Sequence, residues 1–453
     1  MRQKSSFPII EQEKQETLQL LECNLDLNNP FTLRLNRSEL HKEIEVTIDL
    51  LEEVNNQRKK EPEKYKYKYI LGLIHLAYLY QEEDDRSQSV YYFKKALSLL
   101  GDIKVNDEFN DQINSILRIK FSLGNLYLRD GFFRKARKEF ITCKNLANEL
   151  LLIDPEHYIY DLFIYIDGIG DYYYFTDKFG LAKLHYLKAL EFYNTLDDES
   201  KDKLLRLYIT LNYKISRLCK DQLNTKEAVH YCQIAISLLE DLRIKHSSMV
   251  EIRLSVNMLW IQLLIQDGDF ENATHNFIDT ELFFEDLSKH QQYPFLEIFA
   301  KISQELGDYY MISRVINNSK EFYRKALNYI QKVPHPNSFI KAEESAILNN
   351  LSAIYMEKKE VEKVEKLLFK SLNIRQELLK EDPEEHAIDY AGTLLNLAVF
   401  YSDLGIDKKS AKKLLEEALI IMREFNPEEY DTDEEKYSEI MTRAIIMNEQ
   451  FER

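Results

Sequence analysis

A five-residue element with the pattern L-G-x-x-Y recurs eight times along this chain of 453 residues. Its leading residues are Leu76, Leu123, Ile169, Ile215, Trp260, Leu306, Leu351 and Leu397. Successive leading residues stand 47, 46, 46, 45, 46, 45 and 46 positions apart. So regular a period indicates one supersecondary unit repeated in space, because each unit of such an array buries its apolar face against the next unit.

Each element is followed, at a fixed distance, by a small residue and then by a large one. The small residues, thirteen positions after the leading residue, are Ser89, Ala136, Ala182, Ala228, Ala273, Ser319 and Val364. The large ones, four positions later, are Phe93, Phe140, Tyr186, Cys232, Phe277, Tyr323 and Leu368. In the eighth unit one additional residue precedes the small position, so that Ala411 and Leu415 are the equivalents there.

This spacing predicts two packed antiparallel helices in every unit. Small residues at a helix crossing let the two backbones approach, and aromatic side chains fill the volume beside the crossing. In the second unit we expect Gly124 and Ala136 at the close approach, with Tyr127 and Phe140 around it. Gly131 is expected in the turn between the helices, where glycine is favoured.

The combined pattern resembles the tetratricopeptide repeat over residues 70–425. The resemblance implies an all-α fold, a right-handed α-solenoid of antiparallel helix pairs with helical caps. Residues 1–69 are expected to form an N-terminal helical cap or degenerate repeat, residues 70–425 eight helix-pair repeats, and residues 426–453 a C-terminal capping helix. No linker-like composition interrupts them, which favours a single continuous array.

The period of about 46 residues departs from the 34 residues usual in this family. Pro155 and Pro383 each follow 32 residues after their element, and we expect the second helix of the unit to be lengthened accordingly. In this respect the chain is similar to kinesin-light-chain-like repeats and to the repeat arrays of bacterial sensor proteins.

Composition restricts the partners. The net charge of −17 argues against a nucleic-acid backbone as ligand, and no apolar window is long enough for a membrane span. The first residues lack the apolar region of a secretory signal, so we expect a cytoplasmic protein without nucleic-acid or membrane partners. The four cysteines, Cys23, Cys143, Cys219 and Cys232, show no C-x-x-C spacing and are expected to be reduced and buried.

No sequence motif for catalysis is present, and we expect no enzyme activity, no cofactor and no metal. His230 and Cys232 have no further ligands in suitable positions, and Cys232 falls on the predicted core position. The basic run at Arg134–Lys138 flanks the buried Ala136 and is expected to be a solvated helix face.

In the tetratricopeptide family, the first helices line a concave groove, and exposed positions on them contact partners. Carrying over this geometry gives eleven of twelve candidate partner-binding residues, and Arg129 is added as a basic residue beside them. They are Tyr78, Phe121, Asn125, Arg129, Asp171, Tyr174, Tyr213, Arg217, Lys220, Gln262, Asp308 and Asn349. We expect binding to centre on the second to fourth units, where aromatic and basic residues coincide, the types that most often dominate interfaces.

Two functions compete. The first is a non-enzymatic scaffold or adaptor that holds a peptide or protein domain in the groove. The alternative is a bacterial intracellular peptide sensor whose superhelix changes pitch and controls a partner effector, such as a peptidase or a signalling enzyme. An enzyme remains conceivable only where a partner chain completes the site.

Overall fold

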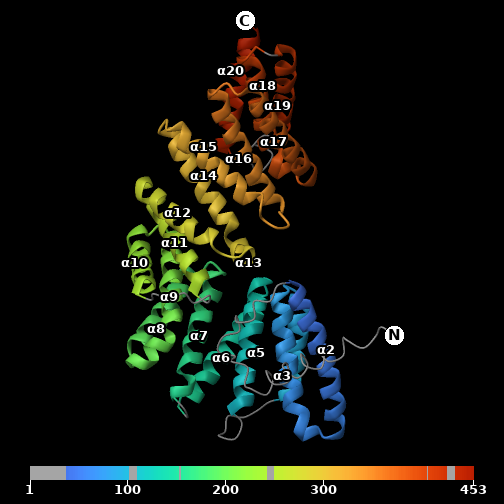
Figure 1. Ribbon diagram of the computed structural model, residues 1–453, viewed down its shortest axis with the longest axis vertical. Helices are drawn as coiled ribbons and strands as arrows, with labels where there is room; N and C mark the ends of the chain where they lie inside the picture. Colours follow the sequence, from blue (N-terminus) through green and yellow to red (C-terminus); the bar gives the residue numbers. More distant parts are fainter. Residues whose placement is uncertain are drawn as a thin grey trace, which may run out of the picture. The chain divides into compact units, whose positions relative to one another are not determined.

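The computed structural model describes residues 37–101, 110–152, 155–241, 249–405, 407–425 and 434–452, and these residues form helices and no strand (Figure 1). The first helices of the eight repeats are α3 (Pro62–Glu82), α5 (Asn110–Arg129), α7 (Pro155–Tyr174), α9 (Asp198–Asp221), α11 (Val250–Gln266), α14 (Leu296–Ile312), α16 (Ser338–Glu357) and α18 (Pro383–Asp403). The second helices are α4 (Arg86–Leu100), α6 (Phe133–Leu151), α8 (Phe179–Asn194), α10 (Thr225–Asp241), α12 (Phe270–Glu285), α15 (Ile316–Ile330), α17 (Val361–Glu381) and α19 (Lys408–Glu424). The predicted all-α architecture of helix pairs is confirmed.

Four further elements flank or interrupt the pairs: α2 (Arg37–Lys60), α13 (Lys289–Gln292), the 3₁₀ turn η2 (Tyr293–Phe295) and α20 (Glu434–Glu452). The chain divides into two compact units, residues 1–256 and 257–453. In the first, Leu51 of α2 packs against Gly72 of α3, and in the second, Ile440 of α20 packs against Gly392 of α18. We propose that α2 and α20 cap the array, because each covers the apolar face of a terminal repeat. The first 36 of residues 1–69, the expected N-terminal cap, lie outside the described residues.

We expected the extra length of the repeat to lie in the second helix, but the first helices are long as well. First helices span 17 to 24 residues, and second helices span 15 to 21. Pro383 is the first residue of α18 and Asp382 caps that helix, so the proline marks the start of the next first helix. Proline suits this position because it has no N–H to leave unpaired.

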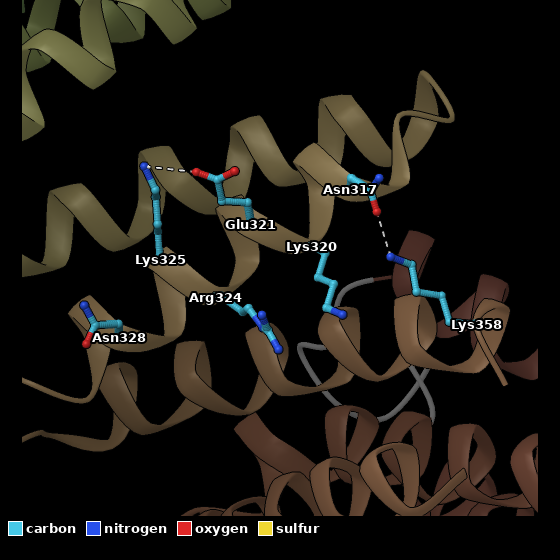
Figure 2. Close-up of a pocket in the computed structure, with 7 residues that line it drawn as sticks. All are labelled: Asn317, Lys320, Glu321, Arg324, Lys325, Asn328 and Lys358. Carbon is cyan, nitrogen blue, oxygen red and sulfur yellow. Dashed lines mark hydrogen bonds and ion pairs between the residues drawn. The ribbon is translucent and has the colours of Figure 1, made fainter. Parts of the chain in front are cut away.

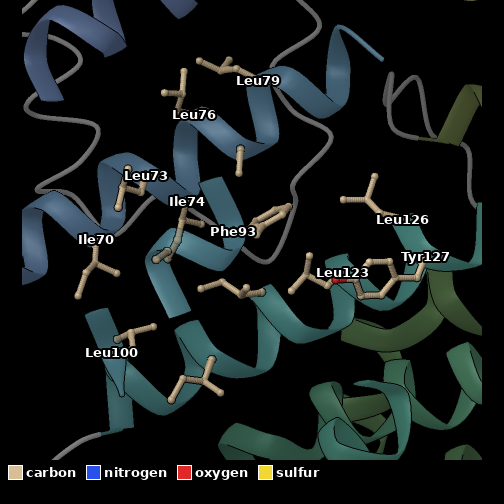
Figure 3. Packing of buried hydrophobic residues seen from close by; sticks show 14 of the residues in the cluster. Ile70, Leu73, Ile74, Leu76, Leu79, Phe93, Leu100, Leu123, Leu126 and Tyr127 are labelled. Atoms are coloured by element: carbon tan, nitrogen blue, oxygen red, sulfur yellow. The ribbon is translucent and has the colours of Figure 1, made fainter. Parts of the chain in front are cut away.

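The predicted core positions are buried in all eight repeats. The small residues Ala136, Ala182, Ala228, Ala273 and Ala411 are completely inaccessible to solvent, as are the large residues Phe93, Phe140, Tyr186, Cys232, Phe277 and Leu415. Figure 3 shows how Phe93 of α4 enters the space between α3 and α5, with Leu76 and Leu123 nearby. The cap of α19 at Asp407 lies one residue later than in the other repeats, which confirms the register break of the eighth unit.

The glycine of the L-G-x-x-Y element makes room for an aromatic ring of the same repeat. A methyl group on Gly124 would lie 2.7 Å from Cε1 of Phe140, and one on Gly307 would lie 3.0 Å from Cδ1 of Tyr323. Because Phe140 is fully buried, its ring has no free space to move into.

We therefore expect Gly124→Ala to lower the free energy of unfolding by about 1–3 kcal/mol through overpacking. Gly180 of α8 is the matched control, because nothing lies within 4 Å of a methyl group there. Gly180→Ala should be neutral or stabilising by up to about 1 kcal/mol, since alanine favours the helix. Urea unfolding of the two variants tests this, and equal effects would contradict it.

The turn inside each repeat has one backbone conformation. A residue with positive φ stands eight positions after every leading residue: Asp84, Gly131, Asp177, Leu223, Gly268, Arg314, Lys359 and Gly405. In six of the repeats, the N–H of the residue after the positive-φ residue donates to the carbonyl oxygen of the fourth residue after the leading one. In the fourth repeat this hydrogen bond runs from Asn224 to Cys219, at 2.9 Å. This Schellman geometry ends the first helix and turns the chain into the second.

Only three of these eight residues are glycine, so the others carry side chains in an unfavourable conformation. Leu223, at φ 58° and 78% exposed, gains little from burial in return. We expect Leu223→Gly to raise the free energy of unfolding by about 0.5 kcal/mol. This is the backbone strain relieved in the folded state, minus the conformational entropy that glycine adds to the unfolded state. The reciprocal change Gly268→Leu should destabilise. A lower unfolding midpoint for Leu223→Gly would refute the assignment of strain.

Candidate functional site

A concentration of polar and aromatic groups lies between α7 and α9, the first helices of the third and fourth repeats. We call it the α7–α9 cluster. Its members are Asp167, Asp171 and Tyr174 of α7, Tyr186 of α8, and Tyr213, Lys214, Arg217 and Asp221 of α9. All of them belong to the first compact unit.

Lys214 joins the two helices at one end of the cluster. Its ammonium lies 2.7 Å from Oδ2 of Asp167 and 2.8 Å from Oδ2 of Asp171, and the three side chains are between 15% and 24% exposed. The hydroxyl of Tyr186 donates to Oδ1 of Asp171 at 2.7 Å. Asp171 is therefore held by two donors. Oδ1 of Asp167 is buried without a hydrogen-bond partner.

These contacts decide where a proton binds. Burial raises the pKa of Asp167 to about 6, and the neighbouring charge of Asp171 adds to this, while Lys214 opposes it. Burial alone would lower the pKa of the Lys214 ammonium, but Asp167 and Asp171 outweigh it and raise that pKa. One ammonium therefore serves two carboxylates, and Asp167 is the group that takes up a proton in mildly acidic solution.

Arg217 lies at the other end of the cluster, against two aromatic rings. Its guanidinium carbon is 4.5 Å from the centre of the Tyr174 ring and 5.8 Å from that of Tyr213. The Tyr174 hydroxyl donates to Oδ2 of Asp221 at 2.5 Å, which fixes the ring across the α7–α9 joint. Burial is the main cause that raises the pKa of Tyr174 to about 12, so the hydroxyl keeps its proton.

No carboxylate among the described residues pairs with the Arg217 guanidinium, and its Nε is buried without a hydrogen-bond partner. A guanidinium positioned over a tyrosine ring is held by the attraction of the ring while its fork of donors stays available. Such a group suits a carboxylate or a carbonyl oxygen of a ligand, with the tyrosine rings as an apolar floor. The arrangement is suited to recognition.

The structure brings together four of the twelve predicted residues: Asp171, Tyr174, Tyr213 and Arg217. Elsewhere in the first unit, Tyr78 has its hydroxyl 3.2 Å from Oγ of Ser122, and burial raises the pKa of Tyr78. Phe121 packs between the rings of Phe140 and Tyr165, with centroids 5.6 and 5.4 Å away, and so contributes to the core. Asn125 and Lys220 are half-buried, and Arg129 is exposed at the end of α5.

Three predicted residues belong to the second unit. Asp308 accepts a hydrogen bond from the hydroxyl of Tyr323 and a longer one from Asn350 at 3.4 Å. Asn349 donates to Oγ1 of Thr393 at 3.0 Å, and Gln262 is half-buried. Asp308 and Asn349 thus have partners within the repeats that position them.

Sequence reasoning missed Lys214, Tyr186 and Asp221. A signal for one of them was present: Asp171 and Tyr186 stand fifteen residues apart, as do Asp308 and Tyr323, and both pairs are hydrogen-bonded. The second repeat has Asn125 and Phe140 at these positions. An aspartate at this position therefore accompanies a tyrosine at the large core position.

The described residues hold no group of three or more His, Cys, Asp or Glu placed for a metal ion. Among them, Cys143, Cys219 and Cys232 are buried and form no disulfide, while Cys23 lies outside the described residues. Burial raises the pKa of Cys219 to about 11 and that of Cys232 to about 12, so both remain protonated. Within the described part of the chain, no helix is both long enough and apolar enough to span a bilayer.

No family model matches the sequence, and no curated protein matches it significantly. Among solved structures, the chain is similar to the apo form of RapI, at 12% identity and a TM-score of 0.49, over 78% of this chain and 97% of RapI. The apo form of the quorum sensor NprR from B. thuringiensis matches at 15% identity and a TM-score of 0.44, over 85% of this chain and 99% of NprR. Kinesin light chain repeats of Podospora anserina match at 17% identity and a TM-score of 0.35, over 47% of this chain and 93% of theirs. The described part of the chain is an all-α array of helix pairs that resembles the tetratricopeptide repeat.

Proposed function

We propose that this chain is a non-enzymatic interaction protein that binds a peptide segment of a partner on the first helices of its third and fourth repeats. One observation carries the proposal: the guanidinium of Arg217 lies against Tyr174 and near Tyr213, and no carboxylate of the described residues pairs with it. Arginine and tyrosine together are typical of the residues that dominate binding interfaces. An oxygen of the peptide would pair with Arg217 while an apolar side chain packs on the rings.

The test is a peptide library screened against the purified full chain, followed by affinity measurements on the selected peptides. Arg217→Gln removes the charged fork and should weaken binding at least about tenfold, the size expected for a charge-assisted hydrogen bond. Lys203→Gln is the matched control, because Lys203 lies on the same helix, 69% exposed, in an ion pair with Glu199.

The selected peptides should bind Lys203→Gln and the unmodified chain equally. Undiminished binding by folded Arg217→Gln would place the peptide site elsewhere on the chain. Loss in both variants would point to general electrostatics and not to a site at Arg217.

The sensor function is favoured by the position of Tyr174, whose ring contacts Arg217 and whose hydroxyl bridges α7 to Asp221 of α9. A ligand at Arg217 would act directly on the joint between two repeats. Small-angle scattering with a saturating selected peptide separates the alternatives. A changed radius of gyration supports a sensor that controls a partner effector, and an unchanged one supports a scaffold.

A further inference from the structure

A second surface of the molecule is positively charged, although the chain as a whole is acidic. It is a pocket of about 440 Å³ on the exposed side of α15, in the second compact unit. Seven residues line it: Asn317, Lys320, Glu321, Arg324, Lys325 and Asn328 of α15, and Lys358 at the end of α16. Figure 2 shows them along the helix, with Lys320 and Arg324 extending to the same side.

The spacing of the α15 residues makes the surface continuous. They stand three, four, seven, eight and eleven positions after Asn317, which places them on one face of a helix. From Asn317 to Asn328 this face is about 16 Å long, at ~1.5 Å per residue. Because an extended chain advances about 3.3 Å per residue, the pocket matches a segment of about five residues better than a single small anion.

The pocket has more positive than negative charge. Four of its seven lining residues are cationic and only Glu321 is a carboxylate. Lys325 is compensated by Glu281, at 2.5 Å, and Lys320 lies 3.6 Å from Glu360. Arg324 and Lys358 have only neutral hydrogen-bond partners among the described residues, and the chain elsewhere is strongly acidic.

Tyr355 of α16 holds Arg324 in the pocket without a carboxylate. Nη2 of Arg324 donates to the Tyr355 hydroxyl at 2.6 Å, and Nε donates to the same oxygen at 3.1 Å. The ammonium of Lys320 lies 4.6 Å from the centre of the Tyr355 ring and that of Lys363 lies 5.1 Å from it, and both also pair with Glu360. Tyr355 carries no charge that would offset the Arg324 guanidinium, so the positive potential of Arg324 remains available to a ligand.

Lys358 donates to Oδ1 of Asn317 at 2.8 Å, so the carbonyl oxygen of that amide is already used. The amide nitrogen of Asn317, the remaining donors of Arg324 and the ammonium groups therefore present hydrogen-bond donors toward the pocket. A lining of donors along a positive strip is complementary to a row of oxygen anions.

We propose that this α15 pocket is a second binding site, which takes an acidic segment of a partner protein about five residues long. Aspartate, glutamate and phosphorylated side chains share the required oxygen-anion chemistry. The proposal is independent of the peptide site at Arg217, because the two sites lie on different helices in different compact units. A nucleic acid is disfavoured, since the net charge of −17 repels its backbone.

The test uses a fluorescent peptide with the sequence Glu-Asp-Glu-Asp-Glu, its Gln-Asn-Gln-Asn-Gln analogue, a phosphoserine peptide and inorganic phosphate. The double variant Arg324→Gln, Lys358→Gln removes the two cations that have neutral partners. Arg137→Gln, Lys138→Gln is the matched control, because it removes two charges from an exposed basic helix of the first unit. A third protein, Arg217→Gln, reports on the other site.

The acidic peptide should bind the unmodified chain and the control equally, and the double variant about tenfold more weakly, with affinity falling as salt rises. The amide analogue should not bind. If the phosphoserine peptide bound more tightly than the acidic peptide, phosphorylated segments would be the better ligand within the same proposal. The proposal would be overturned if the control lost affinity as much as the double variant, or if only Arg217→Gln lost affinity. It would also be overturned if neither anionic peptide bound saturably, or if inorganic phosphate displaced the peptide at equal concentration. Thermal unfolding of each variant shows that it is folded.

Discussion

Lys214→Met should destabilise the α7–α9 joint by about 3–5 kcal/mol, the range measured when one partner of a buried ion pair is removed. The methionine would leave Asp167 and Asp171, whose Oδ2 atoms now lie 2.7 and 2.8 Å from the ammonium, facing each other without a cation. Neither carboxylate is solvated enough to compensate, since their side chains are 15% and 24% exposed. Native-state hydrogen exchange of α7 and α9 measures this locally, which suits a repeat array that does not unfold as one unit.

The double variant Lys214→Met, Asp167→Asn gives the control. It removes one of the two carboxylates together with the ammonium, so it should recover a large part of the loss. Lys203→Met, which breaks the exposed pair with Glu199, should change exchange in α9 very little. Equal effects of Lys203→Met and Lys214→Met would show that the cluster does not hold the joint.

The same cluster predicts the direction of a pH dependence. Burial raises the pKa of Asp167 from its usual value of 3.8 to about 6, so between these values the folded state binds more protons than the unfolded state. The contribution of this group to stability is therefore complete below about pH 4 and is lost as the pH rises through about 6. Without Lys214 the proton is held more tightly, so the cost of Lys214→Met should be larger at pH 8 than at pH 5.

The repeat core was predictable from sequence because its determinants are local and periodic. Ala136 and Phe140 are both on one helix, and their spacing from Gly124 is set by the length of a helix pair. Volume is the property that matters at such positions, and residue type reveals volume directly. That is why even Cys232, which replaces an aromatic residue, could be assigned to the core.

The turns were only partly predictable. Gly131 could be placed in a turn because glycine is the usual residue at positive φ. Leu223 and Arg314 have the same backbone conformation without any signal in their residue type. Here the packing of the two helices fixes the turn, and the local preference of the residue is overridden.

Two members of the α7–α9 cluster, Tyr174 and Arg217, were among the candidate positions carried over from the family resemblance. Lys214 was missed because it stands one residue before the buried Ile215, where a solvated lysine is the ordinary expectation. Its role depends on Asp167 and Asp171, which lie more than forty residues away on the preceding first helix. Pairings between neighbouring repeats depend on how the repeats stack, and a single sequence does not give that.

A comparable buried charge, the Arg375 guanidinium, links the seventh and eighth repeats in the second compact unit. Arg375 of α17 is only 5% exposed, and burial lowers the pKa of its guanidinium. Nη1 lies 2.9 Å from Oδ2 of Asp389 in α18, Nε donates to Oγ of Ser345 at 3.0 Å, and Nη2 donates to the carbonyl of Ala342 at 3.1 Å. One side chain therefore ties three consecutive helices together.

We expect Arg375→Met to destabilise this region by about 3 kcal/mol, because Asp389 loses a partner and two acceptors of α16 lose their donor. Asp389 keeps its contact with Lys436, which limits the loss. The double variant Arg375→Met, Asp389→Ala should be less harmful than the single change, since Lys436 is 45% exposed and can return to water.

Lys370→Met is the matched control, because Lys370 links the same two helices, α17 and α16, through Glu344 but is 49% exposed. Hydrogen exchange across α16 to α18 should therefore accelerate strongly in Arg375→Met, partly in the double variant and little in Lys370→Met. If Lys370→Met were as damaging as Arg375→Met, burial of the guanidinium would not be the source of its effect, and the joint would depend on charge alone.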